Sequence, residues 1–170
     1  MTTCVVLLRG VNVGRHNRLA MADLRSVCET AGATDVRTYV QSGNAVLTWP
    51  GTTAALELAV ADGLTRRLGL TVPVMARTAA ELAAVVARCP WPELDPTLLH
   101  VAFCAGTPDL TGVDLDGYAP ERVAVGERAL YLFHAEGVQR SRLARLRVGT
   151  DLTARNWRTV TALHQLATPG

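Results

Sequence analysis

The chain has no lysine and no isoleucine among its 170 residues, and all 17 of its basic residues are arginine. The absence of lysine excludes several sites whose chemistry needs an amine. These are the Walker A phosphate loop, the Schiff-base lysine, the Ser-x-x-Lys acylation site and the kinase strand lysine. Every cationic contact with a ligand must therefore come from a guanidinium group, whose planar fork suits phosphate and carboxylate oxygens.

Aromatic residues make up only 5% of the chain, against 49% hydrophobic and 19% charged residues, so alanine, valine and leucine must build most of a globular core. No apolar run reaches the roughly 18 residues that span a membrane. Thr2 and Thr3 lead straight into a strand-like run, without a basic segment typical of a secretory signal. The cysteines are widely spaced and form no Cys-x-x-Cys pair, so we expect buried thiols in a cytoplasmic protein with no membrane partner. They are Cys4, Cys28, Cys89 and Cys104.

Metal ligands at typical spacing are also missing. The four histidines, His16, His100, His134 and His164, are scattered, and none has an acidic residue at helical spacing. His100 and His134 fall in expected strands, where we interpret them as core or surface side chains. The sequence therefore predicts no metal site and indicates no cofactor. The net charge of +2 is too small to indicate a general nucleic-acid-binding protein.

The first half of the chain alternates between strand and helix patterns. A Gln41–Asn44 segment rich in turn residues separates two of the strands, which indicates a hairpin. The resulting order, β-α-β-β-α-β, is that of the split βαβ of ferredoxin-like folds. The expected strands are Cys4–Leu8, Val36–Val40, Ala45–Trp49 and Thr71–Ala76, and the expected helices are Met21–Ala31 and Leu56–Leu68.

The second half repeats this theme loosely. The pattern Thr78-x-x-Glu81 is a capping box that opens a helix, and Pro90 closes it. Strands are expected at Leu99–Ala105, Arg122–Val125 and Ala129–His134, a short helix at Ser141–Arg147, and a terminal helix capped by Thr153. The sequence thus predicts an α+β fold of two ferredoxin-like halves packed as one compact unit. The expected division is residues 1–77 and residues 78–170, the latter including the C-terminal helix.

Three polar segments adjoin apolar elements and are candidates for a site. The first, Arg9–Arg18, directly follows the first strand; its glycines let backbone N–H groups approach a ligand. Its Gly-x-x-x-Gly spacing is neither a dinucleotide fingerprint nor a phosphate loop. The second is the hairpin tip Gln41–Asn44, where Ser42 lacks the context of a nucleophile elbow. The third is Thr153–Trp157, where Arg155 stands beside an expected helix N-terminus that favours anions.

These segments together resemble the uncharacterised bacterial family called domain of unknown function 1697. The matching residues are 7–14 (LLRGVNVG), 21–25 (MADLR), 39–44 (YVQSGN) and 153–160 (TARNWRTV). The resemblance implies two ferredoxin-like α+β halves and carries no catalytic assignment. Many relatives have Gly and Lys where this chain has Arg15 and His16, and Pro where it has Ala20. Any ligand contact made by that lysine must here come from arginine.

We therefore expect the three segments to converge on one polar site for a small anionic or nucleotide-like ligand. Arginines would supply charge, amides would supply directional hydrogen bonds, and glycines would allow close approach. Three alternatives stay open: an enzyme of unknown reaction, a nucleic-acid-binding protein, and motif residues that only support the fold. The oligomeric state is unknown. The predicted ligand-binding residues are Arg9, Gly10, Asn12, Gly14, Asn17, Gln41, Ser42, Gly43, Asn44, Arg155 and Asn156.

Overall fold

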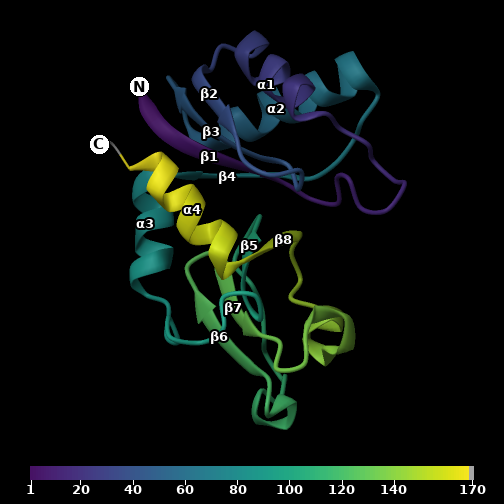
Figure 1. The fold of residues 1–170 in the computed structure, drawn as a ribbon, viewed down its shortest axis with the longest axis vertical. Coiled ribbons are helices and arrows are strands. Elements are labelled where there is room, and N and C mark those ends of the chain that lie inside the picture. The colour runs from purple at the N-terminus through teal and green to yellow at the C-terminus, as the bar shows by residue number, and fades with distance from the viewer. Residues whose placement is uncertain (169–170) are drawn as a thin grey trace. The chain divides into compact units, whose positions relative to one another are not determined.

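The structure, a computed structural model, describes residues 1–168. The chain forms two compact units, one comprising Met1–Ala83 with the segment from Leu163 onward, the other Ala84–Ala162. Each unit is built on a four-stranded antiparallel sheet, with strand orders β2-β3-β1-β4 and β6-β7-β5-β8 (Figure 1). The fold is therefore α+β and has two ferredoxin-like halves, as the sequence predicts.

The first unit has the predicted β-α-β-β-α-β order. Helix α1 ends before Gly32, and α2 ends at Gly69; both glycines have the positive φ that helix termination favours, at 106° and 62°. The two helices lie on one face of the sheet (Figure 1). The elements are β1 (Thr2–Leu8), α1 (Met21–Thr30), β2 (Thr34–Thr38), β3 (Asn44–Trp49), α2 (Thr53–Leu68) and β4 (Val74–Thr78).

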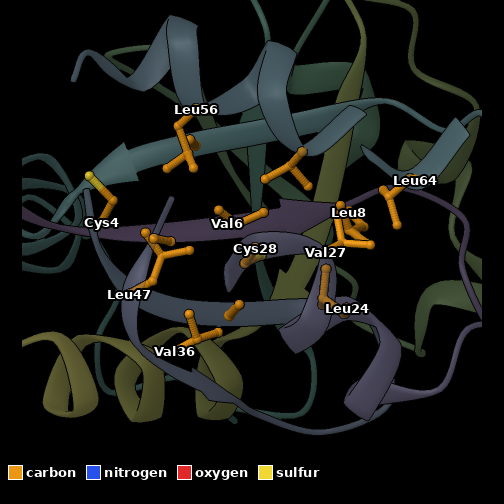
Figure 2. Close-up of a cluster of buried hydrophobic side chains, with 14 of the residues drawn as sticks. Cys4, Val6, Leu8, Leu24, Val27, Cys28, Val36, Leu47, Leu56 and Leu64 are labelled. Atoms are coloured by element: carbon orange, nitrogen blue, oxygen red, sulfur yellow. The ribbon is translucent and has the colours of Figure 1, made fainter. Parts of the chain in front are cut away.

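The core of the first unit lies between this sheet and its two helices (Figure 2). Successive strand residues point to opposite faces, so Cys4, Val6 and Leu8 of β1 enter the core while Val5 and Leu7 face the other way. Helical periodicity aims buried side chains of α1 and α2 at the same layer. These are Leu24, Val27, Cys28, Leu56, Val60 and Leu64.

The second unit keeps the strand order but lacks the two helices between its strands. In their place stand short 3-10 helices. Glycines and prolines in residues 105–121, and Gly137 and Gly149 in the later segment, disfavour a longer α-helix. The short helix predicted at Ser141–Arg147 is present as the 3-10 helix η3, which is shorter than predicted and spans Arg142–Arg145. The elements are β5 (Leu99–Cys104), η1 (Asp116–Tyr118), β6 (Arg122–Gly126), β7 (Ala129–Phe133), η2 (Val138–Arg140), η3 (Arg142–Arg145) and β8 (Leu152–Asn156).

A helix directly follows the last strand of each sheet: α3 (Ala79–Ala87) after β4, and α4 (Trp157–Ala167) after β8. The capping box is confirmed, since the Thr78 hydroxyl accepts from the Glu81 N–H and the Glu81 carboxylate accepts from the Thr78 N–H. The predicted cap at Thr153 is wrong. Asn156 caps α4 instead, accepting from the Thr159 N–H at 2.9 Å, and Thr153 lies inside β8.

The strand registers show which positions of the two sheets are equivalent. In the first sheet Val5 of β1 pairs with Arg77, and in the second Val101 of β5 pairs with Arg155. Each arginine is the penultimate residue of its strand, and one residue separates it from the helix that follows, α3 or α4. Counting outward from these pairs gives further equivalent positions. They include Cys4 with His100, Leu47 with Leu132, Trp49 with His134 and Ala76 with Ala154.

The four cysteines are buried thiols, as predicted. Burial raises the pKa of the Cys28 thiol to about 12, so it carries no thiolate at neutral pH. In the part of the chain that the structure describes, no helix is long and apolar enough to cross a bilayer.

Candidate functional site

The first and second polar segments meet in the first unit. We call Arg9–Leu19 the basic loop and Gln41–Asn44 the hairpin tip. The Asn12 amide group joins them: its Nδ2 donates to the Leu19 carbonyl at 2.8 Å and to the Gln41 carbonyl at 2.7 Å. Its Oδ1 accepts from the Leu19 N–H at 2.9 Å. One side chain therefore closes the basic loop and ties it to the hairpin tip.

The basic loop owes its shape to residues that tolerate positive φ. Gly10, Asn12, Gly14 and Asn17 all have φ between 49° and 68°, the left-handed region that glycine and asparagine adopt most readily. The Asn17 Nδ2 donates to the Gly10 carbonyl at 3.0 Å, and the Asn12 N–H donates to the Asn17 carbonyl at 3.0 Å. These bonds hold the loop in one conformation.

Gly43 fits the hairpin tip against the start of the basic loop. A Cβ at this position would come within 2.6 Å of Val11 Cγ2 and 2.8 Å of Leu8 Cβ, and φ is 82°. The Gly43 carbonyl also accepts from the Leu8 N–H at 2.8 Å. Only glycine allows this approach, so Gly43 has a packing role in addition to any role at a ligand.

The other hairpin-tip residues divide into buried and exposed side chains. Asn44 is fully buried, and its Nδ2 donates to the Tyr39 carbonyl at 3.0 Å and to the Ser42 hydroxyl at 2.9 Å. Gln41 and Ser42 are exposed. A ligand at this surface would therefore meet Gln41 and Ser42, while the amides of Asn12 and Asn44 hold the backbone beneath.

Positive charge is concentrated on the basic loop. Arg9, Arg15 and Arg18 are exposed, as is His16, and residues 9–19 contain no aspartate or glutamate. The Arg9 N–H is fixed to the Pro73 carbonyl at 3.1 Å. Three guanidinium groups on a short, hydrogen-bonded loop give a local excess of positive charge that attracts anions.

The third segment belongs to the second unit, and it differs from the expectation. Arg155 lies within β8 instead of at a helix N-terminus, with 7% of its surface exposed. Its Nη1 donates to the Thr153 hydroxyl at 2.6 Å and to the Ala154 carbonyl at 2.9 Å. Burial lowers the pKa of Arg155 to about 10, which leaves it charged at neutral pH. Asn156 is used as the cap of α4.

Three notable polar residues did not emerge as candidates from the sequence. Arg77, the counterpart of Arg155, is 2% exposed and donates to the Ala76 carbonyl at 2.8 Å. The signal for it is present: in both halves an arginine immediately precedes the capping residue of a helix. His100 and His134 line a cavity of the second unit, described below. Their exposure to a cavity has no local sequence signal, because strand periodicity alone assigns them to a buried face.

Comparison with known proteins supports the resemblance. The family model described as protein of unknown function (DUF1697) matches residues 1–131. The chain belongs to this family. That assignment carries no activity, since the family's description records none.

A solved structure shares the fold. It is that of the conserved bacterial protein SP0830 from Streptococcus pneumoniae, with a TM-score of 0.73 and 20% sequence identity. The similarity covers 98% of this chain and 99% of that one. At this level of identity the likeness establishes the fold alone. No curated protein matches the chain.

Proposed function

We propose that the first unit binds a small anionic ligand, such as a phosphate-bearing molecule, on the surface formed by the basic loop and the hairpin tip. The observation that carries this proposal is the triple hydrogen bonding of Asn12, which fixes the loop against the tip. A loop already held in one conformation loses little entropy when a ligand binds. Guanidinium groups on such a loop can form charge-assisted hydrogen bonds with oxyanions.

The proposal needs residues of the first unit only. Arg155 and Asn156, also predicted as ligand contacts, belong to the second unit. On the basic loop and the hairpin tip, the exposed polar side chains include Arg9, Arg15, Arg18, Gln41 and Ser42. The predicted glycines and asparagines would then fix the backbone conformation of the site.

A nucleic-acid interface is less well supported, because it needs exposed aromatic rings on which bases can stack. Trp49 is 7% exposed and belongs to the core cluster, and its Nε1 donates to the Thr52 carbonyl. Tyr39 is half-buried and follows β2, a strand that carries no aromatic residue. An acid–base enzyme is also less well supported, since the histidines whose pKa burial lowers, His100 and His134, belong to the second unit.

The test is calorimetric titration with pyrophosphate at low ionic strength, where screening is weakest. The double variant Arg15→Gln, Arg18→Gln is expected to weaken binding about tenfold or more, since each lost charge-assisted bond is worth about 1.5–3 kcal/mol. The matched control is Arg25→Gln, Arg66→Gln. It removes the same charge from exposed arginines that pair with Glu29 and Asp62 on α1 and α2.

Binding by the control that matches the wild type would support the local site. Equal weakening in both double variants would show attraction by net charge alone and would contradict it. Absence of pyrophosphate binding in the wild type, with sulfate and phosphate equally inactive, would favour the alternative that the motif residues serve only the fold.

A further inference from the structure

A cavity of about 340 Å³ lies in the second unit, against the sheet face that α1 and α2 cover in the first. Its walls come from β5, β7 and β8 and from residues 138–148, and most of its side chains are apolar, among them Leu130, Leu132, Leu143 and Val148. Its volume is at the small end of the about 300–1,000 Å³ range of ligand pockets. The 3-10 turns η2 and η3 cover the sheet less completely than helices do. Ala154 accordingly is exposed, while its counterpart Ala76 is fully buried.

Two imidazole rings supply the polar part of the lining. His100 of β5 and His134, next after β7, face each other edge to face, with ring centroids 4.9 Å apart. In the first unit the equivalent positions hold Cys4 and Trp49, which are packed into the core. The second unit thus has two imidazole rings at positions where the first unit has a thiol and an indole packed into its core.

Each ring uses one nitrogen within the protein. His100 Nδ1 lies 3.4 Å from the Leu98 carbonyl oxygen. Because a carbonyl only accepts, Nδ1 carries the proton and Nε2 has its lone pair available as an acceptor. His134 Nδ1 is 2.7 Å from the Ser141 hydroxyl, which also accepts from the Leu143 N–H at 3.1 Å. Among the described residues, neither Nε2 has a hydrogen-bond partner, so both are available to a ligand.

Both rings are neutral at neutral pH. Burial lowers the pKa of His100, and burial together with the nearby His100 lowers the pKa of His134 to about 4, although Glu121 acts in the opposite direction. A carboxylate ligand would meet uncharged rings in an apolar cavity and lose its hydration without a counter-charge. A neutral hydroxyl would meet an acceptor whose geometry is already set.

We propose that this cavity binds a small, mainly apolar molecule with a hydroxyl group, of the simple phenol class, whose hydroxyl donates to Nε2 of His100. The ring of the ligand would lie among the leucine and valine side chains, which supply the apolar burial. His134, held by Ser141, would flank the hydroxyl and limit its orientation. This site is separate from the anion surface of the first unit and does not depend on it.

The experiment is an NMR titration of the full chain with 4-ethylphenol, with ethylbenzene and 4-ethylbenzoate as comparison probes. We expect 4-ethylphenol to shift the amide signals of β7 and residues 138–148, with a Kd of about 1 mM or tighter. His100→Phe keeps a flat ring but removes the acceptor. This variant is expected to bind 4-ethylphenol about tenfold more weakly than the wild type does, while its affinity for ethylbenzene stays unchanged.

Ala154→Phe provides the second variant, and its exposed position should tolerate the change. A phenyl ring there would occupy part of the cavity. It is expected to weaken the binding of both 4-ethylphenol and ethylbenzene about tenfold or more. The proposal is overturned if 4-ethylphenol produces no shifts up to about 10 mM, or if its shifts persist in Ala154→Phe. Tighter binding of 4-ethylbenzoate than of 4-ethylphenol would also overturn it, because the cavity would then prefer an acid to a hydroxyl.

Discussion

The two halves of the molecule have sheets of the same strand order, yet one face of each sheet is covered differently. In the first half α1 and α2 cover it and produce a filled core; in the second half, loops with 3-10 turns cover it and leave a cavity. The equivalent positions Trp49 and His134 show the consequence at one site. A helix presents a continuous apolar stripe to a sheet, whereas short turns present separate side chains. The same backbone plan therefore supports a packed structural layer in one half and a lined pocket in the other.

The largest change in stability is expected when leucine is replaced by alanine at two equivalent positions of the two sheets. Leu47→Ala in the helix-covered half should lower the free energy of unfolding by about 3–5 kcal/mol, since it leaves a void in a filled core. Leu132→Ala should cost only about 2 kcal/mol, because one side of that side chain already faces the cavity and has fewer contacts to lose. Urea denaturation of both variants measures the difference. Equal losses would mean that the two layers are packed equally well.

The next comparison concerns a feature that the halves share. Arg77→Met and Arg155→Met should each lower the free energy of unfolding by about 2–3 kcal/mol, because each removes charge-assisted hydrogen bonds from a buried position. The exposed Arg158 of α4 is the control, and Arg158→Met should change stability by less than about 0.5 kcal/mol. Thermal and urea unfolding would measure all three. A large loss in one half and none in the other would show that the equivalent arginines have different roles.

The smallest expected effect is pH-dependent stability that arises from the second half. The pKa of His134 is about 4 in the folded chain, below its ordinary value of 6.5, so the unfolded chain binds the proton more readily. The stabilisation is fully present above pH 6.5 and is lost as pH falls from there to about 4. A shift of that size corresponds to about 3 kcal/mol, and solvent screening at the open cavity should reduce the loss to about 1–2 kcal/mol.

Urea denaturation of the wild type and of His134→Phe between pH 7 and pH 4 checks this expectation. The variant should lose less stability over that interval, since phenylalanine, like tryptophan at the equivalent position 49, does not titrate. An identical decline in stability in both proteins would assign the effect to other titratable groups. His100 and Glu121 are the two whose charges act on His134.

Much of the fold could be predicted from the sequence because local signals agreed with the tertiary structure. In the first half, helical periodicity, strand runs and the hairpin tip all indicated the observed order. In the second half, the pattern that predicted a short helix at Ser141–Arg147 was too short to decide between an α-helix and the 3-10 helix observed at Arg142–Arg145. Thr153 and Asn156 are both plausible caps, and pairing of β8 with β5 decided for Asn156.

The candidate site was predictable in part. The residues of the basic loop and hairpin tip stood out as polar groups beside apolar strands, and the structure brings these two segments together. Which groups face solvent could not be read from the sequence. An asparagine side chain has the same hydrogen-bonding groups whether it contacts a ligand or supports the backbone. Asn12 and Asn44 support the backbone here because the fold brings carbonyls from other parts of the chain next to them.

Sequence pattern and composition were enough to predict the β-α-β-β-α-β order of the first half, the family, and the absence of any permanently cationic side chain other than arginine. These follow from local pattern and composition. Three relations became visible in the folded chain alone: Asn12 links the loop to the tip, Arg77 and Arg155 are equivalent, and His100 and His134 line a cavity. Strand register decides those relations, and a register is set by packing across the whole sheet and not by neighbouring residues.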